Sequence, residues 1–215
     1  MSAAALLEPQ VADAESFAAA AGATPAQMAD LEALRTMLAD WNQRMNLVGP
    51  STLDAFWPRH VWDSAQLLGI APEASTWADI GAGAGFPGLV VAILLKGRPG
   101  ARVELVESLG KRCRFLEAVV AALDLPARVH NARAEALKLK VEVVTARAVA
   151  PLAKLLGFAK PMLDRRALGL FLKGRDAEAE VAEARKLWRF DLVSTPSLSD
   201  PDGRILQIRD LARAR

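Results

Sequence analysis

The chain has 215 residues, the length of one domain with a small appendage, and a folded chain of this size buries about 70% of its unfolded surface. Its single cysteine, Cys113, excludes an internal disulfide, a cysteine zinc cluster and a C-x-x-C redox pair, which fits a reducing cytoplasm. Lys and Arg number 27 against 25 Asp and Glu, so the formal net charge of +2 is too small to indicate a nucleic-acid partner by itself.

The basic residues are nevertheless unevenly distributed. They gather in KRCR (111–114), in the pair 165–166, in KGR (173–175) and at the C-terminal end. Such clusters allow an RNA partner, although they more often belong to a solvated face. The N-terminal residues carry acids where a signal peptide needs bases, and the longest apolar run, LVVAILL (89–95), is far too short to span a bilayer. We therefore expect a soluble, cytoplasmic protein with no membrane partner.

The first 70 residues predict a helical region. The segment TPAQ (24–27) is typical of a capping box with proline at the first helical position, and apolar residues then recur at steps of three and four up to Met45. Residues 1–22 are rich in alanine and predict a shorter helix or a frayed arm. The segment 54–69 predicts another helical piece, broken near Pro58.

From residue 75 onward, short apolar runs alternate with helical stretches, as in the crossover units of a parallel sheet. The predicted helices are 87–96, 109–123, 149–163 and 176–188. The predicted strands are 76–80, 102–106, 127–130, 141–145, 168–172, 190–194 and 204–209. The last two are separated by too few residues for a helical crossover, so we expect them to pair antiparallel at one edge. The prediction is an N-terminal helical region (1–70) and an α/β domain (71–215), whose seven-stranded sheet is mostly parallel with an antiparallel edge strand.

Residues 79–88, DIGAGAGFPG, place four glycines between the first predicted strand and the helix after it. Glycine turns tightly and lets a ligand approach the backbone without a Cβ in the way, and a helix N-terminus adds unpaired N–H groups. The stretch from Gly83 to Gly88 satisfies G-x-G-x-x-G, with the acid Glu107 further on, which is the fingerprint of a dinucleotide site. A lone match of that kind is weak.

The same loop also fits D-x-G-x-G-x-G, in which Asp79 stands two residues before Gly81. A carboxylate there suits a cationic ligand better than a pyrophosphate, and S-adenosylmethionine (SAM) carries both a sulfonium and an ammonium. Glu107, at the end of the second strand, can accept hydrogen bonds from both ribose hydroxyls, and Ala134 with Glu135 can flank the adenine. These features occur in strand order at one sheet edge, so SAM is the predicted cofactor.

The residues after the fourth strand bear on which atom would be methylated. They read TARAVAP (145–151) rather than the N/D-P-P-aromatic motif of enzymes that methylate exocyclic amines. Methylation of a pyrimidine C5 needs an enzyme thiolate, for which Cys113, in the middle of a predicted helix, is a poor candidate. The N7 of guanine has a free lone pair, so it needs alignment and water exclusion but no general base. The lack of a base constellation is compatible with N7, and also with a protein that is not an enzyme.

A set of motifs in order resembles a known family: WNQRMNLV (41–48), RHVWDS (59–64), DIGAGAGFPG (79–88), ESLGKRCRFL (107–116), ARAE (132–135), TARAVAPL (145–152) and FLKGR (171–175). From about residue 30 to the end, the sequence resembles the glucose-inhibited division protein B family of bacterial ribosomal RNA guanine-N7 methyltransferases. The resemblance implies a class I SAM-dependent methyltransferase fold and methylation of the guanine at position 527, in the 530 loop of 16S rRNA. It makes 16S rRNA or the small ribosomal subunit the expected partner; we expect no metal and a monomer.

The resemblance also implies roles for individual residues. The expected cofactor contacts, together with those read from the loop spacing, are Asp79, Gly81, Gly83, Gly85, Phe86, Glu107, Ala134, Glu135 and Arg147. The candidate catalytic residues are Arg147 and Arg133, and the candidate substrate-binding residues are Lys111, Lys173 and Arg204. These basic side chains would face the cofactor carboxylate or RNA phosphate, and the planar fork of arginine grips two oxygens together.

Three other functions remain open from the residues alone. A NAD(P)-dependent oxidoreductase would use the G-x-G-x-x-G spacing of the loop. A non-catalytic rRNA-binding assembly factor would keep the cofactor pocket without using it. A small-molecule methyltransferase is disfavoured, because the helical region precedes basic clusters rather than an obvious apolar lid.

Overall fold

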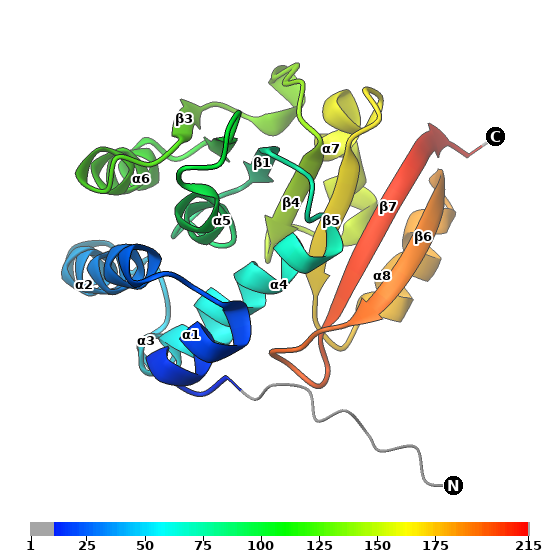
Figure 1. Ribbon diagram of the computed structural model, residues 1–215. Coiled ribbons are helices and arrows are strands. Elements are labelled where there is room, and N and C mark those ends of the chain that lie inside the picture. Colours follow the sequence, from blue (N-terminus) through cyan, green and yellow to red (C-terminus); the bar gives the residue numbers. More distant parts are fainter. Residues whose placement is uncertain (1–10, 215) are drawn as a thin grey trace, which may run out of the picture.

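The computed structural model describes residues 11–214, whose strands form one sheet with helices on both faces (Figure 1). The strands are β1 (Thr76–Ile80), β2 (Arg102–Glu107), β3 (Ala127–Asn131), β4 (Val143–Arg147), β5 (Leu168–Lys173), β6 (Trp188–Pro196) and β7 (Arg204–Arg213). Their order across the sheet is β3-β2-β1-β4-β5-β7-β6. This confirms the predicted α/β fold with a seven-stranded, mostly parallel sheet.

The direction of β7 differs from that of its neighbours. The ladder from β3 to β5 is parallel throughout, whereas β7 runs antiparallel to β5 on one side and to β6 on the other. The predicted antiparallel pairing of the last two strands is confirmed, but the antiparallel strand is second from the edge and β6 is outermost. Helix α8 (Ala177–Arg185) connects β5 to β6, which lies two positions further along the sheet. The chain then returns through a hairpin and places β7 between these two strands.

Alternate strand residues contribute to two cores on opposite faces of the sheet, as the two-residue period of a strand requires. On β4, for example, Val143 belongs to one core and Val144 to the other. Helices α5 (Gly88–Leu95) and α6 (Gly110–Ala122) cover the first face, and α7 (Leu152–Leu163) covers the second beside α8. The crossover helices therefore lie where the alternating pattern predicts them.

The N-terminal helices α1 (Ala14–Ala21) and α2 (Pro25–Met45) join the first core. The predicted capping box is present, because the Thr24 side chain accepts from the Gln27 N–H and Gln27 accepts from the Thr24 N–H. The Gln27 amide also donates to the Leu94 carbonyl at 2.9 Å, which ties α2 to α5. Helix α1 forms part of the segment 1–22 that was predicted as a short helix or an arm. Residues 1–10 of that segment lie outside the described residues.

The predicted break near Pro58 is a short interruption in an otherwise helical stretch. Helix α3 (Pro50–Asp54) is followed by a π-helical segment, η1 (Trp57–Trp62), and then by α4 (Asp63–Ile70). Pro58 is the second residue of η1, where its missing N–H removes no bond from within the helix. Segments of π-helix are often found at functional sites, and η1 carries Arg59 and His60 toward the end of β4.

Candidate active site

The glycines in the loop between β1 and α5 have different surroundings. Gly81, Gly83 and Gly85 all have positive φ angles, of +68°, +55° and +91°. A Cβ on Gly81 would lie 2.7 Å from a methyl group of Val149, and one on Gly85 would overlap Leu89. A Cβ on Gly83 would meet nothing nearer than the Gly81 carbonyl at 3.6 Å. Gly83 is therefore the glycine that faces open space, where a ligand can approach the backbone.

Asp79 anchors the start of α5 instead of facing that open space. Its Oδ2 accepts from the Gly88 N–H at 2.9 Å and its Oδ1 accepts from the Thr145 hydroxyl at 3.2 Å. The residue is 1% exposed, and this burial raises the pKa of its carboxyl to about 7. The carboxylate is closed off from solvent and bonded to the start of α5 and to Thr145, away from the open side of Gly83, so this geometry does not provide the direct contact with a cationic ligand that the spacing predicts.

Glu107, which closes β2, lies directly against the glycine loop. Its Oε2 accepts from the Gly83 N–H at 3.1 Å, and its Oε1 accepts from the Leu109 N–H at 2.8 Å. The next segment, after β3, is bound to the same place, because the Ala132 N–H donates to the Glu107 carbonyl at 3.1 Å. Ala134 follows as a buried residue and Glu135 as an exposed one. The structure thus brings the ends of β1, β2 and β3 together as predicted from the sequence.

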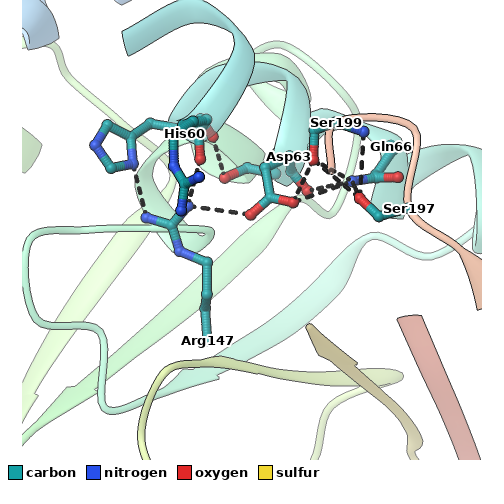
Figure 2. A network of polar contacts seen from close by, with 8 residues as sticks. His60, Asp63, Gln66, Arg147, Ser197 and Ser199 are labelled. Carbon is teal, nitrogen blue, oxygen red and sulfur yellow. Dashed lines mark hydrogen bonds and ion pairs between the residues drawn. The ribbon is translucent and has the colours of Figure 1, made fainter. Parts of the chain in front are cut away.

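Arg147, the last residue of β4, reaches toward η1 and α4 (Figure 2). Its Nη1 donates to the Arg59 carbonyl at 2.6 Å and pairs with Oδ2 of Asp63 at 3.1 Å, and its Nη2 donates to Nδ1 of His60 at 2.9 Å. The guanidinium carbon also lies 5.2 Å from the centre of the Phe86 ring. Arg147 therefore joins the helical region to the glycine loop, a role that its sequence motif did not reveal.

Asp63 extends this network to the hairpin between β6 and β7, as Figure 2 shows. Its Oδ1 accepts from the Ser199 hydroxyl at 2.6 Å and from the Gln66 amide at 3.2 Å. Gln66 in turn donates to Ser197 and accepts from the Leu198 N–H. The hairpin is consequently held against α4 by Oδ1 of Asp63 and by the Gln66 amide, while Oδ2 of Asp63 binds Arg147.

A cavity of about 670 Å³ opens at the carboxyl ends of β4 and β5. Three of the predicted site residues line it together: Arg147, Lys173 and Arg204. The Lys173 side chain is largely buried, and its ammonium donates to the Ala150 carbonyl at 2.7 Å and to Glu180 at 2.6 Å. This cavity lies beyond β4, whereas Gly83, Glu107 and Ala134 lie on the other side of Arg147.

Two of the predicted catalytic and substrate-binding residues lie outside the cavity. Lys111 is exposed in the first turn of α6, and Arg133 is exposed just before the short segment η2 (Ala134–Ala136). Sequence reasoning in turn did not assign Arg59, His60 and Asp63, which line the cavity. In RHVWDS, Arg59 and His60 stand four and three residues before Asp63, a spacing that places all three on one face of a helical segment and could have indicated them.

The residues around the glycine loop fit SAM as a group. The open side of Gly83 leaves room for a nucleoside, and Glu107 keeps further lone pairs for the two hydroxyls of a ribose. Among the described residues, no group of three metal-ligating side chains comes together, and no helix is both long and apolar enough to cross a membrane. With the strand order given above, this site defines the class of the protein as a class I SAM-dependent methyltransferase.

Comparison with known proteins identifies the family within that class. The family described as rRNA small subunit methyltransferase G matches residues 27–206, and this chain belongs to it. A relative named Ribosomal RNA small subunit methyltransferase G, from Caulobacter vibrioides, is 61% identical over 98% of each chain. Another with this name, from Parvibaculum lavamentivorans, is 44% identical over 94% of this chain and 92% of its own. These relatives favour neither the oxidoreductase nor the non-catalytic assembly factor.

Solved structures in complex with SAM or SAH share the fold at low sequence identity. The O-methyltransferase from Bacillus cereus, in complex with SAH, superposes with a TM-score of 0.55 at 14% identity, covering 85% of this chain and 91% of that one. A mutant of MtNAS in complex with S-adenosylmethionine gives a TM-score of 0.54 at 15% identity, covering 92% and 84%. At these identities the likeness concerns the fold.

Proposed function

We propose that this enzyme methylates N7 of a guanine in 16S rRNA, the guanine at position 527 in the 530 loop. The observation that carries the proposal is the cavity beside Arg147, whose walls include the cationic side chains of Lys173 and Arg204. An RNA loop brings negative phosphates with its base, and Arg204, which pairs with no carboxylate among the described residues, can compensate them, whereas Lys173 is already paired with Glu180. The names of the relatives, which state an rRNA of the small subunit, support the same substrate.

On this proposal the cofactor lies across the glycine loop. Gly83 would present its backbone, Glu107 would accept the ribose hydroxyls, and Ala134 with Glu135 would flank the adenine. Bound SAM supplies an electrophilic methyl group on its sulfonium. Arg147, held against Phe86, lies between the loop and the cavity and orients the cofactor toward the target base.

The cavity suits a target atom that needs no deprotonation. Among its described lining residues, His60 is neutral, since burial and the charges of Arg147 and Arg59 lower its pKa to about 3. The carboxylate of Asp63 is paired with Arg147, that of Glu180 is paired with Lys173, and Oδ1 of Asp200 accepts from the Asp202 N–H. Guanine N7 carries its own lone pair, so alignment and exclusion of water are what these residues have to provide.

The rRNA would present its guanine from a loop, because the deep major groove of an A-form helix hides N7. Lys111 and Arg133 are exposed outside the cavity, where they would contact phosphates of the flanking strand. Lys173 and Arg204 would contact the target nucleotide itself. These assignments make Lys111 and Arg133 contributors to RNA affinity, with little expected effect on the rate of methyl transfer, and for Arg133 this replaces the catalytic role that the sequence predicts.

The test is methyl transfer to an unmodified substrate. Purified protein should transfer labelled methyl from SAM to small ribosomal subunits, or to their rRNA, from a strain lacking this gene. Borohydride and aniline should then cleave the RNA at the modified guanine. Incorporation of label without cleavage would contradict the N7 assignment. RNA binding without incorporation under single-turnover conditions would point instead to the assembly factor.

The proposal includes the organisation and setting of the protein. Residues 1–70 act as a helical region that supplies Arg59, His60 and Asp63, and residues 71–215 act as the methyltransferase domain. The protein works as a monomer in the cytoplasm, where bacterial rRNA is made and assembled. Light scattering on the purified protein should give the mass of one chain, and a dimer mass would contradict the monomer.

A further inference from the structure

The imidazole of His60 joins the glycine loop to the end of β4. It is 5% exposed and lies flat against Phe86, with ring centres 4.4 Å apart and planes at 13°. Its Nδ1 lies 2.9 Å from Nη2 of Arg147, and Figure 2 shows the ring beside the guanidinium. One ring therefore contacts a residue on the cofactor side and the arginine at the border of the cavity.

The contact with Arg147 fixes which nitrogen of the ring carries the proton. A guanidinium only donates hydrogen bonds, so Nδ1 of His60 has to accept and Nε2 has to carry the hydrogen. The neutral ring acts as a fixed acceptor, and its lone pair on Nδ1 is not available to a substrate proton. His60 is thus built to hold a neighbour in place, and a role as general base does not fit.

The same tautomer has a cost to the fold. The Nε2–H is buried, and no described residue offers it a partner. An unpaired buried donor destabilises a protein, and an apolar group of similar shape removes that penalty. If His60 served packing alone, a phenyl ring would stack on Phe86 equally well without a buried, unpaired Nε2–H. The presence of histidine here points to the use of Nδ1.

We propose that His60 is a positioning residue for methyl transfer, whose Nδ1 holds the Arg147 guanidinium against Phe86 at the border between cofactor loop and cavity. The inference rests on the proposed function, in which Arg147 contacts the cofactor. The Arg59 carbonyl and Asp63 bind one nitrogen of the fork, and His60 binds the other. Acceptors on both nitrogens fix the plane of the guanidinium, and without Nδ1 it can rotate while still paired with Asp63.

Three substitutions of His60 separate this role from packing. His60→Phe keeps a stacking ring and removes both nitrogens, so we expect kcat to fall about 10- to 100-fold. The melting temperature should change little, because removal of the unpaired Nε2–H offsets the loss of the bond to Arg147. His60→Asn can place an amide oxygen near the position of Nδ1 and should recover part of kcat. His60→Gln places its amide near the position of Nε2 and should not recover it.

Trp62→Phe is the matched control. Trp62 lies in the same η1 segment and is buried, and its Nε1 is the other buried side-chain nitrogen that lacks a partner among the described residues. Its ring contacts Phe17 edge to face. This variant should lower the melting temperature through lost packing and leave kcat unchanged, which is the reverse of the result expected for His60→Phe.

The outcomes distinguish the inference from the proposed function. Wild-type kcat in His60→Phe, or a melting temperature that falls together with kcat in all three His60 variants, would overturn the positioning role. Arg147→Ala provides the reference: if it is impaired while His60→Phe is not, only the inference about His60 fails. If Arg147→Ala itself shows normal kcat and normal KM for SAM, the role of Arg147 in the proposed function fails.

Discussion

The two sides of the site are built in different ways. The cofactor side comes from short local segments, the glycine loop and the acids Asp79 and Glu107 at the ends of neighbouring strands. The cavity side depends on contacts between distant segments, since Arg147 binds Asp63 and Asp63 binds Ser199. Single backbone positions should therefore control cofactor affinity, whereas the cavity should respond gradually to loss of individual contacts.

The largest effect is expected on the cofactor side, from Gly83→Val. A branched side chain there would enter the open space of the loop, and the φ angle of +55° is strained for any residue with a Cβ. SAM affinity measured by calorimetry should fall by about 100-fold or more, which corresponds to about 3 kcal/mol or more. Unchanged affinity would contradict the placement of the cofactor on this loop.

Gly97→Val is the control for backbone strain. Gly97 follows the C-terminal end of α5, has a φ angle of +86°, and a Cβ there would meet nothing within 4 Å. Its substitution imposes similar strain at the opposite end of the same helix. It should lower stability by a similar amount and leave SAM affinity within about twofold, because no ligand contact changes.

Arg147→Ala acts on the boundary between the two sides and should come next. The substitution removes the bonds to the Arg59 carbonyl, Asp63 and His60, so we expect kcat to fall about 100-fold. Stability should fall by about 1–3 kcal/mol, because Asp63 loses its ion pair in a largely buried place. Steady-state kinetics and urea denaturation measure the two effects separately.

Arg175→Ala shows what the loss of an arginine costs outside this network. The Arg175 side chain is 79% exposed and lies 3.7 Å from Asp202, an arrangement that contributes little to stability. Its kcat and its denaturation midpoint should remain close to those of the wild type. Equal losses in both arginine variants would mean that net charge, rather than the position of Arg147, determines activity.

The cofactor side, which comes from local segments, is also the part that the sequence predicts well. Strand β1 was predicted at its observed bounds, and the loop after it and the acid that closes β2 occupy neighbouring strand ends. Strand β4 begins two residues later than predicted, at Val143, and at this end the side chain of Glu142 accepts from the backbone N–H groups of Ser75 and Thr76. Periodicity finds a strand but does not show such a cross-link.

The contacts of the cavity could not be predicted in this way. Arg147 and Asp63 are 84 residues apart, and Ser199 and Asp63 are 136 apart, so no local pattern links them. The burial of Asp79 is a further example, since its spacing to Gly81 is the same whether the carboxylate faces a ligand or the N-terminus of α5. Pairing of charges across the fold is decided by packing, which a single sequence does not display.

A smaller effect is expected from Ser199→Ala on the cavity side. The Ser199 hydroxyl donates to Asp63 at 2.6 Å and holds the hairpin that leads to Arg204. Its loss should raise KM for rRNA about threefold to tenfold, which corresponds to about 0.7–1.4 kcal/mol, because Asp63 keeps its bonds to Arg147 and Gln66. Ser199→Thr keeps the hydroxyl and should restore KM. A change in SAM affinity without a change in KM for rRNA would place the hairpin on the cofactor side instead.

Asp79→Asn should change catalysis least and the pH dependence of stability most clearly. The pKa of Asp79 is raised from 3.8 to about 7, mainly by burial, so the native state keeps a proton that the unfolded chain releases between about pH 4 and 7. The contribution of Asp79 to the free energy of unfolding is therefore lost as the pH rises through this window. Asparagine does not titrate, and its amide can still bond to the Gly88 N–H and to Thr145.

Urea denaturation of wild type and Asp79→Asn at pH 5, 6, 7 and 8 isolates this contribution from other groups. The difference in free energy of unfolding should shift in favour of the variant by at most about 1.4 kcal/mol per pH unit up to pH 7, and level off above it. SAM affinity should change by less than about threefold, since both carboxylate oxygens of Asp79 are bonded to Gly88 and Thr145 and neither faces the open side of Gly83. A pH-independent difference would mean that Asp79 is ionised throughout, and a large loss of affinity would return its carboxylate to the cofactor site.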